Sequence, residues 1–295
     1  MLPPPLPESA HGSSSSGSSR KRKRTQLHSQ ASSVASSADG SRRGIAFSSA
    51  TRDKVKRLNS GDACWHCGAS PVDVCHIITK NNRQFELNKS AGLLNIDSLA
   101  DDANAVPLCP LCHRNFDDLI NPGFIFFPCD IVFFETFEQA DFRRRRERYF
   151  TTRTPVQRIT PTGVDYRAHQ LRAGRIEEDV NGGLYQRYML YDYLPKYRCC
   201  AAVNRVGQVF EAAPWHGDPM AALHRSFAAL SSTVLRGLPL DKRMELQELQ
   251  NLYIQNDASY MTPGAQDEHL DHPGSPRHSF ESSGGFPGSH GHAYR

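Results

Sequence analysis

Two short stretches of the sequence concentrate residues that can bind metal or transfer protons: VCHIITK at residues 74–80 and ANAVPLCPLCHRNFDD at residues 103–118. In the first, His76 lies within a β-branched run. In the second, His113 directly follows a cysteine pair, and Asp117 comes four residues later. Imidazole and carboxylate groups supply the general bases and metal ligands of hydrolytic sites. The two stretches therefore predict either an enzyme or a zinc-binding module.

Two cysteine pairs have the spacing of a zinc site. Two residues separate Cys64 from Cys67, and two separate Cys109 from Cys112. This spacing brings both sulfurs of a pair to one ion, and two pairs complete a tetrahedral Zn²⁺ site. We predict structural Zn²⁺ held by four thiolates. His66 is an alternative ligand, and two unrelated redox or buried pairs are the alternative to a metal site. The other cysteines lack this spacing and are predicted to be outside the site: Cys75, Cys129, Cys199 and Cys200.

The order of these residues resembles the HNH endonuclease superfamily. The ββα-metal motif of that family has a histidine on its first strand, an asparagine near its second strand and a final histidine on its helix. His76 in CHII, Asn104 in NAVPLC and His113 in CPLCHRNFD match these positions. Many members also carry two cysteine pairs as a zinc staple. The resemblance covers about residues 60–127, under a third of the chain.

The resemblance implies a metal-dependent endonuclease that hydrolyses phosphodiester bonds, and we expect DNA as the substrate. His76 would be the general base that activates water, and Asn104 would orient His76 or its loop by hydrogen bonding. His113, with Asp117, would hold a catalytic divalent cation, which is Mg²⁺, Mn²⁺ or a softer ion. The alternative is a catalytically silent zinc-binding module that binds nucleic acid or a protein partner.

One position departs from the family pattern. HNH proteins commonly have an aspartate or histidine metal ligand directly before the first histidine, whereas this chain has Cys75. A thiol is a poor ligand for Mg²⁺, which prefers oxygen. A softer ion, a ligand set of His113 and Asp117 alone, or a loss of catalysis would each account for the cysteine. Asp73, two residues earlier on the same side of the strand, is a further candidate ligand.

Composition separates the middle of the chain from two polar ends. Residues 1–50 are mostly serine, glycine and charged residues, and residues 261–295 are rich in proline, glycine, serine and histidine. Such segments bury too little apolar surface to offset the entropy lost on ordering, so we predict two disordered tails. The basic run RKRKR at residues 20–24 is either a nuclear-import signal or a solubilising run.

Hydropathy and net charge indicate where the protein is located and what it binds. The sequence has no apolar run long enough for a membrane span and no signal segment, so we expect an intracellular protein without membrane contact. The net charge is only +4, so nucleic-acid binding must depend on local basic clusters. The candidate nucleic-acid contacts are Arg114, Arg143, Arg144, Arg145 and Arg146, with plain solvated charge as the alternative.

The expected fold class is α+β. We predict a zinc-stapled ββα-metal domain of the treble-clef-like HNH type over residues 51–137, followed by a mixed α/β extension of unknown role over residues 138–260. The predicted strands are residues 72–78, 123–127, 131–134, 183–194 and 207–213. The predicted helices are residues 110–120, which place His113 and Asp117 on one face, residues 138–150, and two that open at Pro219 and Pro239.

Overall fold

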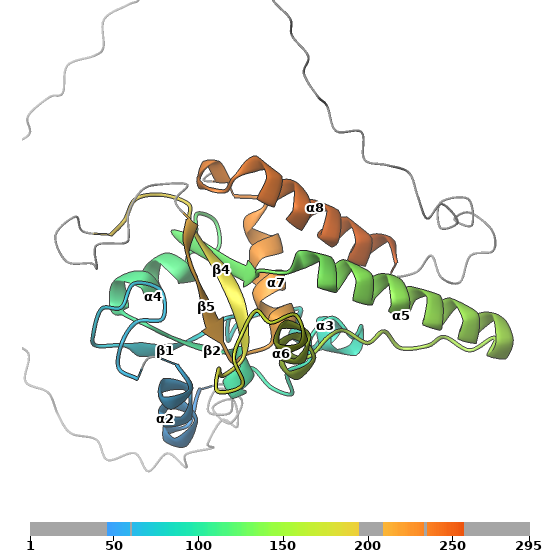
Figure 1. The fold of residues 1–295 in the computed structure, drawn as a ribbon, viewed down its shortest axis with the longest axis horizontal. Helices are drawn as coiled ribbons and strands as arrows, with labels where there is room; N and C mark the ends of the chain where they lie inside the picture. Colours follow the sequence, from blue (N-terminus) through green and yellow to red (C-terminus); the bar gives the residue numbers. More distant parts are fainter. Residues whose placement is uncertain (1–45, 60, 195–208, 233–234, 257–295) are drawn as a thin grey trace, which may run out of the picture. The chain divides into compact units, whose positions relative to one another are not determined.

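The computed structural model describes residues 46–59, 61–194, 209–232 and 235–256, which form a mixed α+β structure (Figure 1). The predicted α+β class is confirmed. The elements follow in this order: α2 (Ser49–Leu58), β1 (Asp73–His76), α3 (Phe85–Ser90), the 3₁₀ turn η1 (Asp102–Asn104), β2 (Ala105–Leu108), α4 (Pro110–Asp117), β3 (Phe124–Pro128), α5 (Ile131–Thr152), α6 (Gly163–Arg172), β4 (Gly183–Met189), β5 (Val209–Trp215), α7 (Pro219–Ala229), the 3₁₀ turn η2 (Leu235–Gly237) and α8 (Leu240–Gln255).

Some predictions fall outside this part of the chain. RKRKR and most of both predicted tails lie outside the described residues, as do Cys199 and Cys200. None of the helices in the described ranges is long and apolar enough to cross a membrane.

The strand that carries His76 pairs with the strand that precedes the second cysteine pair. β1 and β2 are antiparallel, with His76 opposite Ala105 and Cys75 opposite Val106. Successive side chains of a strand point to opposite faces of the sheet. Cys75 accordingly lies in the main hydrophobic core, whereas Val74 packs against a smaller cluster beside α2.

Helix α4 begins where the sequence predicts and ends earlier. Pro110 is its first residue, a position that suits proline because no intrahelical partner exists there for a backbone N–H. The helix ends at Asp117 instead of Ile120. The Asp118 carboxylate accepts hydrogen bonds from the backbone N–H groups of Ile120 and Asn121, at 3.0 and 2.9 Å, and this turn directs the chain out of the helix.

A second antiparallel sheet has the strand order β3-β4-β5. Strand β3 lies before residue 137, whereas β4 and β5 lie after it. One sheet therefore crosses the boundary predicted between the zinc domain and the extension. Helix α7 packs on β3, where the Ser226 hydroxyl donates a hydrogen bond of 2.9 Å to the Phe126 carbonyl. Side chains from both regions share one hydrophobic core.

The strand predicted at residues 131–134 is wrong, because these residues form the first turn of α5. Ile131 and Phe134 are buried, whereas Val132 is 64% exposed. Buried residues three apart indicate the 3.6-residue period of a helix. A run of four apolar residues is too short to distinguish this period from the two-residue period of a strand. The helix predicted over residues 138–150 is the continuation of this longer helix.

Candidate metal centre and the adjoining cleft

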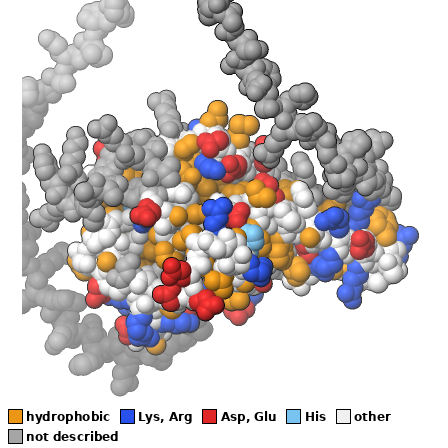
Figure 2. Space-filling model, in the orientation of Figure 1, with side chains coloured by type: hydrophobic (Ala, Val, Ile, Leu, Met, Phe, Trp, Pro, Cys, Tyr) orange, Lys and Arg blue, Asp and Glu red, His pale blue; other side chains and the backbone are white. Residues whose placement is uncertain are grey.

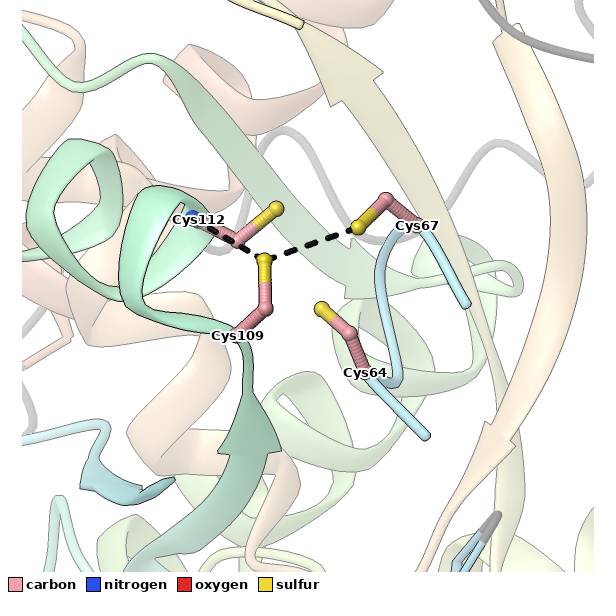
Figure 3. Close-up of side chains that lie close together, drawn as sticks. All are labelled: Cys64, Cys67, Cys109 and Cys112. Carbon is pink, nitrogen blue, oxygen red and sulfur yellow. Dashed lines mark hydrogen bonds between the residues drawn. The ribbon is translucent and has the colours of Figure 1, made fainter. Parts of the chain in front are cut away.

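The four cysteines of the two predicted pairs come together at one point. The sulfurs of Cys64, Cys67, Cys109 and Cys112 all lie within 4.8 Å of one another, and the four residues are buried. Figure 3 shows the four side chains directed toward a common centre, two from the turn before β1 and two from the start of α4. Four buried thiols at this separation can bind one metal ion.

The distances fit a tetrahedral thiolate site. A Zn–S bond of about 2.3 Å requires sulfurs about 3.8 Å apart in a regular tetrahedron. The sulfurs of Cys67 and Cys109 are 3.7 Å apart. Hydrogen bonds from Cys112 and Cys67 hold the pKa of the Cys64 thiol well below its ordinary value, and the same contacts raise the pKa of Cys112, so without a cation the cluster favours one thiolate, at Cys64. The arrangement is consistent with structural zinc.

Local backbone structure shapes both halves of this cluster. The Gly68 N–H donates to the Cys64 carbonyl at 2.8 Å, and Gly68 has φ 76°, a left-handed conformation that glycine adopts without steric cost. On the other side, Cys109 is the N-cap of α4, and its sulfur accepts a hydrogen bond from the Cys112 N–H at 3.5 Å. The positive end of a helix dipole favours a thiolate at this position.

Residues from the C-terminal half support the cluster. The Arg187 guanidinium on β4 donates to the carbonyls of Trp65 and His66, at 2.6 and 3.0 Å. The Tyr193 hydroxyl donates to the Cys112 sulfur at 3.6 Å. Hydrogen bonds to metal-binding side chains and their backbone orient the ligands. The extension therefore positions the cysteine cluster.

The other cysteines of the described region, and His66, lie outside this cluster. Cys75 is buried in the core and Cys129 is exposed, and neither belongs to the group that could hold a metal ion. The His66 ring stacks on Phe124 with 3.8 Å between ring centroids, and burial lowers the pKa of His66 to about 3. The four thiols, without His66, form the group that could hold a metal ion.

A cleft of about 930 Å³ runs along β1 beside this cluster. Its walls come from α2, from β1 and the loop after it, and from α4. Both histidines of the HNH pattern, His76 and His113, line this one cleft, as do Asp73 and Asp117. The cationic residues among the lining are Arg52, Lys56 and Lys80. The cleft thus brings two imidazoles, several carboxylates and several cations to a single space.

His113 lies between two of these carboxylates. Asp117 Oδ2 is 3.1 Å from His113 Nε2, as expected for residues four apart on a helix, and Asp73 Oδ2 is 3.9 Å from Nδ1. The hydrogen bond to Asp117 raises the pKa of His113, and partial burial opposes that shift. The two carboxylates lie at opposite ring nitrogens, which is the geometry of an ion pair with a protonated imidazole, and in the described part of the chain the four cysteines are the group close enough together to hold a metal ion.

Asn104 holds the loop that follows His76. Its buried side-chain oxygen accepts a hydrogen bond from the Ile78 N–H at 2.8 Å, and its amide donates to the carbonyls of Ile78 and Leu99 at 3.0 Å each. Its own carbonyl accepts from the Ile77 N–H at 2.9 Å. Asn104 therefore satisfies the backbone of the two residues directly after His76, which restricts where His76 can lie.

Cys75 does not line this cleft. Its side chain is 1% exposed, and burial raises the pKa of its thiol. Asp73 lies two residues earlier and does line the cleft.

The predicted arginine contacts do not form one surface. Arg145 is 1% exposed, with its guanidinium bound to Glu138 at 2.9 Å and to Asp141 at 2.7 Å. This burial removes Arg145 from the residues that nucleic acid could reach. Arg144 pairs with the same Asp141 and also donates to the Gln157 carbonyl.

The exposed arginines of α5 lie away from the cleft. Arg143 is exposed, and Arg146, which is half-buried, stacks on the Phe150 ring. Lys and Arg side chains gather over the C-terminal end of α5 in Figure 2. Arg114 is exposed on α4 but does not line the cleft.

The wall that α2 contributes to the cleft is not predicted by any pattern in the sequence. Phe47, just before α2, and Arg52 and Lys56 of α2 line the cleft. Phe47 is an aromatic residue at the edge of a serine-rich segment, and its burial shows that ordered structure begins before residue 51. Spacing along the chain gives no sign that this segment packs beside His76.

Comparisons with known proteins do not assign a family. No family model matches the sequence. No curated protein and no solved structure matches the chain significantly.

Proposed function

We propose that this protein is a metal-dependent endonuclease of the HNH type. The observation that supports the proposal most strongly is the single cleft that contains His76, His113, Asp73 and Asp117 next to a buried four-cysteine cluster. The sequence has the three residues in the HNH order, and the shared cleft would let His76 and His113 act on one substrate.

Each residue of the cleft has a role in this proposal. His76 accepts a proton from the attacking water, whose oxygen bonds to phosphorus as the bond to the leaving oxygen breaks and that oxygen takes a proton from solvent. His113 and Asp117 would hold a divalent cation, with Asp73 as a further candidate ligand from β1. The cation would stabilise the negative charge on the phosphate and on the leaving oxygen. Asn104 keeps the loop after His76 in place.

The cysteine cluster has a structural role in this proposal. Zinc on Cys64, Cys67, Cys109 and Cys112 joins the turn before β1 to the start of α4. His76 ends β1, which follows that turn, and His113 lies on α4, so a bound zinc would help to fix the separation of the proposed base and the proposed cation ligand. Arg52 and Lys80 are exposed at the cleft, which three aspartates also line, and would contact the phosphates of a polyanionic substrate, which we propose is DNA.

A silent binding module is the second candidate, and Cys75 favours it. The position that commonly carries a hard ligand holds a thiol here, and that thiol is buried outside the cleft lining. In this case the zinc cluster and the cations of the cleft would serve nucleic-acid or protein binding alone.

Plasmid nicking by the full-length protein separates the two candidates. With Mg²⁺, Mn²⁺ or Ni²⁺ we expect wild-type protein to nick supercoiled DNA, and His76→Ala to lose about 10²–10⁴ of the rate while remaining folded. His113→Ala should lose activity that a higher metal concentration partly restores. His169→Ala, which removes a partly exposed histidine from α6, is the matched control and should retain activity. Inactive wild-type protein across these metals, on DNA and on RNA, would favour the silent module.

A further inference from the structure

The aromatic ring of Phe47 lies flat against the imidazole of His76. Their ring centroids are 4.0 Å apart and their planes differ by 20°. Phe47 is 5% exposed although it lies just two residues before the start of α2. A parallel ring at this distance covers one face of the imidazole and limits its rotation about the side-chain bonds.

Phe47 is itself held firmly. It packs with Val55 of α2 and Ala105 of β2, both fully buried, and Val74 of β1 contacts the same cluster. The backbone begins the helix directly after it, because the Ser48 hydroxyl accepts a hydrogen bond from the Thr51 N–H at 3.0 Å and caps α2. The position of the Phe47 ring is therefore coupled to the position of the helix.

Two polar contacts fasten α2 to the rest of the protein. Lys54 Nζ is 2.7 Å from a carboxylate oxygen of Asp102, two residues before Asn104. At the C-terminal end of the helix, the Asn59 amide is 3.3 Å from His216 Nδ1, and His216 Nε2 is 2.9 Å from the Asp102 carbonyl. The helix is thus attached to the same turn that places Asn104.

We propose that Phe47 is a positioning residue for His76. The ring holds the imidazole in the orientation from which it can accept a proton from water, and α2 serves as the support for that ring. Asn104 acts on the backbone after His76, whereas Phe47 acts on the imidazole itself. The inference rests on the proposed endonuclease function, because it assigns Phe47 a part in the same reaction.

A substitution series at Phe47 in the full-length protein tests the proposal. Phe47→Leu keeps an apolar side chain of similar length and removes the ring, whereas Phe47→Tyr keeps the ring. Leu246→Ala, which alters a fully buried residue of α8 far along the chain from the cleft, controls for lost stability. The rate of plasmid nicking is measured with Mn²⁺ over a range of DNA concentrations up to saturation, so that kcat and KM are obtained separately.

We expect Phe47→Leu to lower kcat by about ten- to a hundredfold with little change in KM, because a misplaced catalytic group slows the chemical step. Phe47→Tyr should retain kcat within about threefold, and Leu246→Ala should retain it at a temperature where that variant is folded. A folded Phe47→Leu variant with the wild-type kcat would overturn the proposal.

A second measurement does not depend on activity. In a spectrum of the histidine ring protons, the His76 signals, identified by their loss in His76→Ala, should be shifted upfield by the ring current of Phe47. They should move downfield in Phe47→Leu and stay in place in Leu246→Ala. Unmoved signals in Phe47→Leu would overturn the proposal even in an active enzyme. If wild-type protein is inactive but the His76 signals still depend on Phe47, the proposed endonuclease function is contradicted and the contact between the two rings is supported.

Discussion

Asp73 Oδ2 lies 3.9 Å from His113 Nδ1, although Asp73 belongs to β1 and His113 belongs to α4. Asp117 contacts the other ring nitrogen at 3.1 Å. His113 is therefore flanked by two carboxylates from different elements, which offer the hard oxygen ligands that Mg²⁺ and Mn²⁺ prefer. In the proposed function, Asp73 is therefore a candidate for the ligand position that Cys75 leaves without an oxygen.

Replacement of Asp73 should weaken the binding of a divalent cation. We expect Asp73→Asn to raise the Mn²⁺ concentration for half-maximal nicking by about ten- to a hundredfold, because the amide has no negative charge to offer the ion. Titration of activity with Mn²⁺ measures this directly. Asp97→Asn is the matched control, since Asp97 is exposed and pairs with Lys89 outside the cleft. Equal metal dependence of the two variants would exclude Asp73 as a ligand.

Zinc should be required for the fold around the cysteine cluster. Binding to four thiolates contributes on the order of 10 kcal/mol in small zinc domains, which is comparable to the whole net stability of a domain. Metal analysis should find one zinc per chain, and Cys109→Ser or a chelator should abolish cooperative thermal unfolding of this region. Cys129→Ser, which alters an exposed cysteine outside the cluster, should keep zinc and stability. Folded protein free of zinc would contradict this role.

The cations of the cleft should contribute to nucleic-acid affinity. Arg52 and Lys80 are exposed and line the cleft. We expect Arg52→Ala with Lys80→Ala to weaken binding of a DNA duplex and to reduce the salt dependence of log K by about 0.9 for each lost phosphate contact. Fluorescence anisotropy across a range of salt concentrations measures both quantities.

The exposed arginines of α5 provide the comparison for that experiment. Arg143→Ala with Arg148→Ala removes the same charge from a helix that does not line the cleft. We expect a smaller loss of affinity from this pair. A larger loss would mean that nucleic acid follows α5 in place of the cleft.

Stability should decrease with rising pH because of Asp218. Burial raises the pKa of Asp218 to about 6, against the hydrogen bonds that its carboxylate accepts from backbone N–H groups such as those of Asn95 and Ala221. The unfolded chain releases this proton near its ordinary pKa of 3.8, whereas the folded protein retains it until about pH 6. Between these values the unfolded state binds fewer protons, so the free energy of unfolding falls as pH rises.

Asp218→Asn isolates this contribution. Asparagine also caps helices well and stays uncharged, so the stability of the Asp218→Asn variant relative to wild type should rise by about 2 kcal/mol between pH 4 and pH 6.5. Urea denaturation across this range measures the difference. Parallel pH profiles for the two proteins would contradict the assignment to Asp218.

Local rules in the sequence predicted several elements well. Pro110 indicated the start of α4, and Asp218 and Pro219 indicated the start of α7, because caps and prolines act on their immediate neighbours. The same rules failed at residues 131–134, where four apolar residues fit a strand or a helix equally well. In the structure these residues form a helix, in which Ile131 and Phe134 are both buried on one face.

The sequence by itself determined the pairing of cysteines into one candidate site, because two residues between ligands is a local geometric requirement. Only the tertiary structure decided which charged and aromatic residues share the cleft with His76. Phe47, Asp73 and His113 lie on three separate elements, and their approach depends on how α2 and α4 pack around β1. Arg145 shows the same dependence on packing. The sequence predicts an exposed arginine on a charged helix, whereas the structure buries Arg145 in ion pairs with Glu138 and Asp141. Contacts between distant segments follow from core packing and have no counterpart in spacing along the chain.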